Sequence, residues 1–159
     1  MHVSEIALIN QFIDRILVTI LRGSHITPEL GLPTEPVIHT ECHVAGWGKT
    51  EEHGQSPVIL STTISVMSKA YCNTHQGLMY KRLTGVFSFC AGLDAGGNDS
   101  CQGDSGGPLY CKQGESYVLY GITSKGGRCG AEKQPGIYTK VSNILPWIQK
   151  HTEGTYLNI

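Results

Sequence analysis

The sequence places one serine, Ser105, inside the glycine-rich stretch SCQGDSGGPL at residues 100–109. A serine hydroxyl becomes a nucleophile when a neighbouring base accepts its proton. The glycines let the backbone turn so that the amides of Gly103 and Ser105 face one point, and such an oxyanion hole stabilises a transition state by about 3 kcal/mol per donor. At ordinary residue frequencies the hexapeptide GDSGGP arises by chance in about one in 10⁵ chains of this length. The stretch therefore predicts a nucleophile for acyl transfer rather than an ordinary glycine turn.

The elements that hold this stretch are expected to be β-strands. The chain has 159 residues, of which 40% are hydrophobic and 16% charged, so it can build one domain with a real core. Its 20 glycines and its recurring runs of Val, Ile, Thr, Tyr and Ser favour an all-β fold with many turns. The net charge of -1 gives no indication of binding to nucleic acid or to an anionic membrane.

Periodicity and turn residues predict the order of these elements. Strands are predicted over residues 43–48, 58–66, 108–111, 117–123 and 136–141. A helix is predicted over residues 143–150, with Ser142 as its N-cap and Pro146 in its first turn. Residues 28–36, which read PELGLPTEP, are predicted to form a connector at a boundary because prolines punctuate them. Short strands followed by one terminal helix indicate a β-barrel.

The six cysteines indicate disulfides. They are Cys42, Cys72, Cys90, Cys101, Cys111 and Cys129. Their number is even and no two have the C-x-x-C spacing of a zinc cage, so three disulfides and an oxidising compartment are predicted, while the sequence leaves their pairing open. Residues 1–23 lack a basic start and polar residues interrupt their apolar runs, so they predict neither a signal peptide nor a membrane span. We therefore expect that something upstream of this chain is missing.

Four segments carry a resemblance to a known family. They are CHVAGWGKT at 42–50, SCQGDSGGPL at 100–109, YGITSKGGRCG at 120–130 and QPGIYTKVSNILPWI at 134–148. Together they resemble the C-terminal half of a trypsin-like serine protease of the chymotrypsin family, from about Leu32 to about His151. That family folds as two six-stranded β-barrels with the active site between them. The resemblance implies that residues 28–159 form the second barrel and the C-terminal helix, that residues 1–27 are a divergent remnant, and that the first barrel is largely missing.

The resemblance also implies a disulfide pattern and a location. It pairs Cys42 with Cys111, Cys72 with Cys90, and Cys101 with Cys129. The third bridge would tie the nucleophile loop to the opposite wall of a specificity pocket. Members of this family are secreted, in agreement with the cysteine usage.

By the same resemblance, Asp99 forms the floor of a substrate pocket, six residues before Ser105. A carboxylate there pairs with a substrate Arg or Lys, and Ser124, Gly126 and Gly136 match positions along the pocket walls. The competing interpretation is that Asp99 is a surface acid in a turn. Lys125 stands where the family usually has Trp, which removes an aromatic wall and puts a cation near a pocket for cations.

The base that Ser105 needs is the weakest part of the resemblance. Seven histidines are present, but none has the Ala-Ala-His-Cys context of the family, and His43 and His53 read as structural or solvated residues. Glu5 in EIALI matches the acid of the family segment Asp-Ile-Ala-Leu-Leu. Its extra methylene displaces the carboxylate by about a bond length, and orientation at such a site is sensitive to about 1 Å. A solvated Glu at a strand start is an equally good interpretation of this residue.

By the same resemblance, Asp104, which precedes the nucleophile, matches the acid that pairs with a new N-terminal ammonium when the family's zymogens are activated. This chain begins with Met1 and contains no matching activation sequence. We therefore expect an unpaired Asp104 carboxylate, which is costly when buried, and a poorly formed oxyanion hole.

Two functions remain at this point. The first is a serine endopeptidase that cleaves after Arg or Lys, with this chain weak or inactive by itself. The second is a non-catalytic pseudoprotease that binds a partner at Asp99. Both imply polypeptide substrates or protease inhibitors as partners, and no motif calls for a metal or another cofactor.

Overall fold

The computed structural model describes residues 28–30, 38, 40–51, 54–75, 87–114 and 116–151. In chain order the elements are β1 (Pro28–Leu30), β2 (Glu41–Gly46), β3 (Leu60–Val66), α2 (Lys69–His75), β4 (Ser88–Gly92), β5 (Pro108–Gln113), β6 (Ser116–Lys125), β7 (Gly136–Lys140) and α4 (Val141–His151). Glu5 and residues 1–27 lie outside the described part of the chain. No helix within the described ranges is long and apolar enough to cross a membrane.

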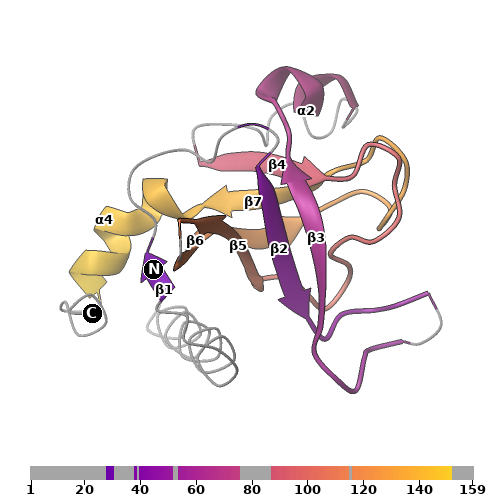
Figure 1. Cartoon of the computed structure of the whole chain (residues 1–159), viewed down its shortest axis with the longest axis horizontal. Coiled ribbons are helices and arrows are strands. Elements are labelled where there is room, and N and C mark those ends of the chain that lie inside the picture. The colour runs from indigo at the N-terminus through magenta and orange to yellow at the C-terminus, as the bar shows by residue number, and fades with distance from the viewer. Residues whose placement is uncertain are drawn as a thin grey trace.

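Six strands close into an antiparallel β-barrel (Figure 1). The sheet runs in the order β6-β5-β2-β3-β4-β7, and an additional pairing between β7 and β6 closes it. Strand β6 closes the barrel because its residues 116–122 pair with β5 and its residues 121–125 pair with β7. The all-β prediction and the family's six-stranded barrel with a C-terminal helix are thus confirmed.

Strand β1 lies outside the barrel and corrects one prediction. Residues 28–36 were expected to form a connector, but Pro28–Leu30 pair in parallel with residues 117–119 of β6. Proline is tolerated at the first residue of an edge strand, where its missing N–H costs no ladder hydrogen bond. The prolines therefore punctuate this segment without preventing a short strand.

The core fills the inside of the barrel. On β2 the side chains of Cys42 and Val44 are buried, and the intervening His43 lies on the outer face against Tyr110 and Tyr117. This alternation is the period of two that a strand imposes on its side chains. The core residues are Cys42, Val44, Ile64, Val66, Phe89, Ala91, Leu109, Cys111 and Tyr138. Each fully buried aliphatic or aromatic side chain contributes about 1.5–3 kcal/mol.

Three disulfides connect the elements in the pairs that the family resemblance implies. Cys42–Cys111 joins directly opposed residues of β2 and β5, and Cys72–Cys90 joins α2 to β4. Cys101–Cys129 joins the loop before Ser105 to the loop after β6. No cysteine of the described residues is free.

The C-terminal helix begins earlier than predicted. Helix α4 starts at Val141, directly after β7, so Ser142 lies inside the helix and does not cap it. Val141 is fully buried, and its packing draws the start of the helix onto the barrel. Pro146 consequently lies in the second turn, where its missing N–H leaves the carbonyl of Ser142 without its helical donor.

The sequence did not predict the short helix α2 or strand β4. Helix α2 is only seven residues long, but Ser68 caps it, because the Ser68 hydroxyl accepts a hydrogen bond from the Tyr71 amide at 3.1 Å. A serine at this spacing is a usual N-cap signal. Strand β4 pairs with both β3 and β7, so its structure depends on partners far away in the chain.

Candidate active site

Ser105 lies at the tip of a tightly bonded loop that leads into β5. The Asp104 amide donates to the Cys101 carbonyl at 3.0 Å, and the Gly107 amide donates to the Asp104 carbonyl at 2.7 Å. A further bond, from the Gly106 amide to the Thr123 carbonyl at 2.6 Å, ties the loop to β6. The serine is therefore exposed to solvent while the backbone on both sides of it is held in place.

Glycine is required at three positions of this loop. Gly103 and Gly106 have φ values of 102° and 84°, in the left-handed region that other residues rarely adopt. A Cβ on Gly107 would lie 2.8 Å from the Asp104 carbonyl oxygen, which is too close for a side chain. Backbone conformation and lack of space for a Cβ thus explain why GDSGGP has glycine at these three positions.

The backbone amides beside the serine are available for a ligand. Within the described ranges, the N–H groups of Gly103 and Ser105 donate no hydrogen bond. Exposed donors on a fixed loop are the kind of group that stabilises a developing negative charge. Neither does the Ser105 hydroxyl have a hydrogen-bond partner among these residues.

Asp104 has two backbone partners, contrary to the sequence-based expectation that its carboxylate would be unpaired. Its Oδ1 accepts the Gly48 amide at 2.7 Å, and its Oδ2 accepts the Cys101 amide at 2.9 Å. A Cβ on Gly46 or on Gly48 would overlap this carboxylate. The glycines of the AGWG segment therefore leave the space that Asp104 occupies, and two N–H donors from the described residues stabilise its charge.

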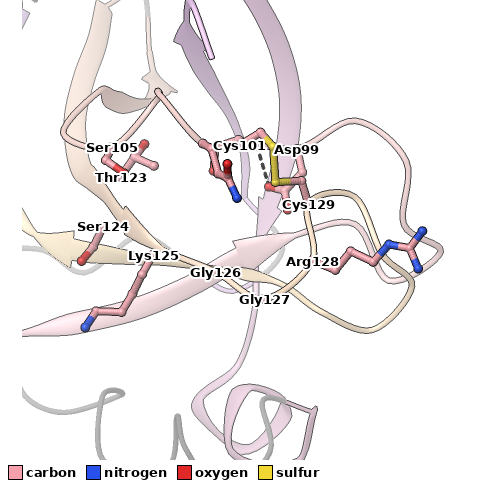
Figure 2. A pocket seen from close by; sticks show the side chains of 12 residues that line it. Asp99, Cys101, Ser105, Thr123, Ser124, Lys125, Gly126, Gly127, Arg128 and Cys129 are labelled. Atoms are coloured by element: carbon pink, nitrogen blue, oxygen red, sulfur yellow. Dashed lines mark hydrogen bonds between the residues drawn. A yellow bond between two sulfur atoms is a disulfide. The ribbon is translucent and has the colours of Figure 1, made fainter. Parts of the chain in front are cut away.

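A pocket of about 240 Å³ joins Ser105 to Asp99 (Figure 2). Its lining consists of Asp99, Ser100, Cys101, Gln102, Ser105, Thr123, Ser124, Lys125, Gly126, Gly127, Arg128 and Cys129. In Figure 2, Ser105 and Ser124 lie on one side of the pocket, and Asp99 lies on the other beside the Cys101–Cys129 disulfide. The volume is below the roughly 300–1,000 Å³ of pockets for drug-sized ligands, so the pocket suits a single side chain.

The Asp99 carboxylate is half-buried and has no cationic partner among the described residues. Burial raises the pKa of Asp99, and the nearby charge of Asp104 adds to the increase. Hydrogen bonds from the backbone oppose it, including one from the Ser100 amide at 2.7 Å. A carboxylate whose charged form is penalised by burial favours a cation that enters the pocket.

Two predicted site residues lie outside the pocket lining. Gly136 is buried on β7, where a Cβ would lie 3.1 Å from the Tyr138 hydroxyl. It supports the wall from behind, because the Cβ position of Gly126 is 3.6 Å from the Gly136 Cα. Gly103 is likewise absent from the lining, whereas its neighbour Gln102 is part of it.

Sequence reasoning missed Tyr138 and Arg128. The Tyr138 hydroxyl lies 2.9 Å from the Ser100 hydroxyl beneath the loop that carries Asp99, and burial together with the Asp99 charge raises the pKa of this tyrosine. Arg128 reaches the pocket lining as an exposed residue next to Cys129. The pattern around Tyr138 predicted only a strand, so nothing local distinguished its hydroxyl from that of any core tyrosine.

Neither histidine whose side chain is described contacts Ser105. His43 lies 3.3 Å from the Thr63 hydroxyl through its Nδ1 and stacks on Tyr110. His75 belongs to α2 and stacks on Tyr71. In the described ranges there is also no group of three or more His, Cys, Asp or Glu residues that could hold a metal ion.

Behind the pocket, two loops are joined by backbone contacts. The Gly97 amide donates to the Gly130 carbonyl at 2.8 Å, and the Lys133 amide donates to the Asp94 carbonyl at 3.0 Å. A Cβ on Gly130 would overlap the Gly97 carbonyl oxygen. The loop before Asp99 and the loop after Cys129 therefore touch through their main chains.

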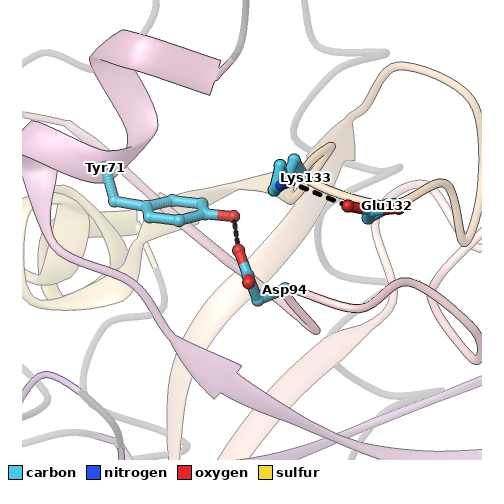
Figure 3. Close-up of polar contacts among 4 residues, drawn as sticks. All are labelled: Tyr71, Asp94, Glu132 and Lys133. Carbon is cyan, nitrogen blue, oxygen red and sulfur yellow. Dashed lines mark hydrogen bonds and ion pairs between the residues drawn. The ribbon is translucent and has the colours of Figure 1, made fainter.

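Side chains support the same region (Figure 3). The Tyr71 hydroxyl donates a hydrogen bond to the Asp94 carboxylate. Burial and this bond raise the pKa of Tyr71 to about 12. Glu132 and Lys133 form an exposed ion pair of 2.9 Å between neighbouring residues. Helix α2 is thereby connected to the loops that carry the pocket wall.

The family comparison agrees with the barrel, the glycine loop and the pocket. The family model described as Trypsin matches residues 17–148 of this chain. The match spans most of the 159 residues and includes the loop of Ser105, the pocket and all six cysteines. The chain therefore belongs to the trypsin family of serine proteases.

Proposed function

We propose that the protein is a serine endopeptidase that cleaves polypeptides after Arg or Lys. In this proposal Ser105 is the nucleophile and Asp99 recognises the basic side chain. One observation carries it: the exposed Ser105 and the half-buried Asp99 carboxylate, which forms no ion pair with any described residue, line one pocket of a size for a single side chain. Polypeptide substrates and protease inhibitors are the partners typical of the family, and the three disulfides are consistent with an extracellular protein.

The chemistry follows from the positions of these groups. The Ser105 Oγ attacks the carbonyl carbon of the peptide bond, and a base takes the hydroxyl proton. The amides of Gly103 and Ser105 donate hydrogen bonds to the resulting oxyanion. The same proton then goes to the leaving amine as the C–N bond breaks, and water hydrolyses the ester formed on Ser105.

Recognition would come from charge and shape together. A guanidinium or ammonium group at Asp99 pairs with the carboxylate, and an Arg pair can be bidentate. Gly126 and Gly127 contribute no side chains, which leaves the pocket open along that wall. Ser124 lies on the Ser105 side of the pocket and Gly136 supports its wall.

No residue is assigned as the base in this mechanism. None of the seven histidines has the sequence context of the family's base, and the orienting acid proposed at Glu5 lies outside the described residues. We expect the 159-residue chain by itself to show weak proteolysis or none. Residual catalysis from the oxyanion hole and binding alone is small.

A fluorophosphonate probe tests the nucleophile directly. The folded, disulfide-oxidised chain is incubated with the probe beside a Ser105→Ala control, and covalent labelling is measured by mass spectrometry. Labelling of the unmodified chain that is absent in Ser105→Ala shows that Ser105 is activated within this chain, and it overturns our expectation of weak activity. Labelling absent from a sample with native disulfides and a cooperative unfolding transition supports that expectation.

The second candidate is a non-catalytic binding module. It is favoured by one observation: the Ser105 hydroxyl has no partner in the described ranges, while Asp99 lines a pocket of about 240 Å³. Such a module would hold a basic segment of a partner without cleaving it. Binding of an arylamidine such as benzamidine in the absence of fluorophosphonate labelling would favour this candidate over the enzyme.

A further inference from the structure

Two cationic side chains, Lys125 and Arg128, line the same pocket as Asp99. Both residues are exposed, and neither forms an ion pair within the part of the chain that the structure describes. Figure 2 shows them leaving the segment between Ser124 and Cys129 in opposite directions, so one lies on each side of the two glycines. The pocket thus combines the half-buried carboxylate of Asp99 with two exposed cations, the ammonium group of Lys125 and the guanidinium group of Arg128.

Hydrogen bonds of the main chain hold the backbone of Lys125 and of Arg128 in place. Lys125 ends β6 and pairs with Ile137 of β7. The Arg128 amide donates to the Gln134 side-chain oxygen at 3.1 Å. A Cβ on Gly127 would lie 2.6 Å from that same oxygen, so the glycine lets Gln134 reach the Arg128 amide. The long side chains are exposed to solvent, and their attachment points are held at the pocket rim.

We propose that Lys125 and Arg128 form an anion-selecting rim, which makes the pocket prefer a basic residue that has an acidic side chain within about three positions of it. This inference rests on the proposed recognition of Arg or Lys by Asp99. A residue in an extended peptide spans about 3.3–3.6 Å, so side chains up to three positions away reach the rim while the basic residue occupies the pocket.

Charge complementarity is the reason for this preference. A peptide with further basic residues is attracted by Asp99 but repelled by two cations at the entrance. In a peptide with an acidic residue near the basic one, the basic side chain meets Asp99 and the acidic side chain meets the rim cations. Like charges brought together at an interface disfavour the wrong partners. A polyanion such as nucleic acid gains from only two cations and is repelled by the carboxylate in the same pocket, so a mixed-charge polypeptide fits better.

The expected effect is modest because the rim is exposed. Each solvent-exposed ion pair changes an equilibrium by about 1.4- to 5-fold, and two pairs together by about 2- to 30-fold. Salt screens such pairs. The preference should therefore be largest at low ionic strength and shrink towards unity in concentrated salt.

The test measures dissociation constants by fluorescence anisotropy with the oxidised Ser105→Ala chain, which prevents turnover. Three peptides of equal length carry one central Arg flanked by Asp residues, by Ser residues or by Lys residues. We expect the Asp-flanked peptide to bind about 2- to 30-fold more tightly than the Ser-flanked one, and the Lys-flanked peptide to bind most weakly. A fourth peptide keeps the Asp flanks and replaces Arg by norleucine, which should abolish binding.

Variants locate the effect. Lys125→Gln combined with Arg128→Gln should bring the three Arg peptides to similar affinities, and Lys112→Gln, an exposed lysine on β5 outside the pocket lining, should leave their order unchanged. Equal affinities for all Arg peptides with both rim cations present overturn the inference and leave the proposed recognition by Asp99 intact. If Asp99→Asn does not weaken any Arg peptide, or none binds, the proposed recognition fails and the inference fails with it.

Discussion

Replacing Asp99 by asparagine separates its role in binding from its role in the fold. Asparagine has nearly the same shape and can still accept the hydrogen bond from the Ser100 amide. The substitution removes the negative charge that lines the pocket and keeps this contact with Ser100. We expect the Asp99→Asn protein to lose affinity for an arylamidine while it stays folded.

The size of the loss can be worked out from the surroundings of Asp99. Two unit charges 4 Å apart attract by about 4 kcal/mol at the effective dielectric constant near a protein surface. Removing one partner of a desolvated, hydrogen-bonded pair costs about 2–5 kcal/mol in measured complexes. Because Asp99 is only half-buried, the lower part of this range applies. A loss of about 2–4 kcal/mol corresponds to arylamidine binding that is about 30- to 1,000-fold weaker.

The same substitution, Asp99→Asn, should leave the folding stability unchanged or raise it, although it weakens binding. Burial raises the pKa of Asp99 in the folded state above its unfolded value. Between those two values the folded protein binds more protons, so the free energy of unfolding decreases as the pH rises through this window. At neutral pH the ionised carboxylate therefore destabilises the fold. Asp99→Asn should unfold at an equal or higher temperature and should lose this part of the pH dependence.

Isothermal titration calorimetry with benzamidine and thermal unfolding measure both effects on the same samples. Glu132→Gln serves as the matched control, since it removes an exposed carboxylate behind the pocket. Acidification should also weaken arylamidine binding to the unmodified chain at a higher pH than an ordinary aspartate would require, because the Asp99 pKa is raised. Unchanged affinity in Asp99→Asn would refute the electrostatic reasoning. A large drop in its unfolding temperature would show that Asp99 is structural.

Three further changes test the scaffold around the site. Gly48→Ala places a methyl group against the Asp104 carboxylate and should lower the free energy of unfolding by about 1–3 kcal/mol, as measured by urea denaturation; unchanged stability would contradict the close approach. Ile64→Ala empties part of the barrel core and should cost about 2–5 kcal/mol in the same assay, whereas a loss below 1 kcal/mol would place Ile64 outside a packed core. Replacing Cys101 and Cys129 together by serine opens a bridge with a sequence separation of 28 and should cost about 3–4 kcal/mol of stability. That double variant should also bind benzamidine more weakly, and full affinity would show that the pocket wall does not need the bridge.

The sequence predicted the strands and the glycine turn of Ser105 because both follow from strong local constraints, whereas the position of Asp99 in the same pocket was implied by the family resemblance alone. Alternating side chains specify strands, and GDSGGP requires glycines at particular backbone angles whatever surrounds them. The short elements and the Asp104 contacts could not be predicted in the same way. The Gly48 amide that binds Asp104 lies 56 positions away in the sequence, and no local pattern shows which amide faces a carboxylate.

The end of the last strand shows a similar limit. The sequence around Ser142 has a good N-cap residue, but the burial of Val141 decides where helix α4 begins. Gly136 was expected on the pocket wall, and it lies one layer behind that wall because Tyr138 and Gly126 occupy its surroundings. For the helix, tertiary packing, which acts between distant residues, overrides a correct local preference. The expectation for Gly136 came from the family resemblance and from no local pattern.

The main-chain contact between Gly97 and Gly130 bears on how this pocket can be re-engineered. The two loops are bonded through amides and carbonyls, and Gly130 has no room for a Cβ beside the Gly97 oxygen. Loop transplantation from a homologous protease therefore has a minimum unit: the segment around Gly97 and the segment around Gly130 must be exchanged as a pair. A chimaera that receives one of them alone inherits a mismatched backbone beneath Asp99, however well its new side chains suit the intended substrate.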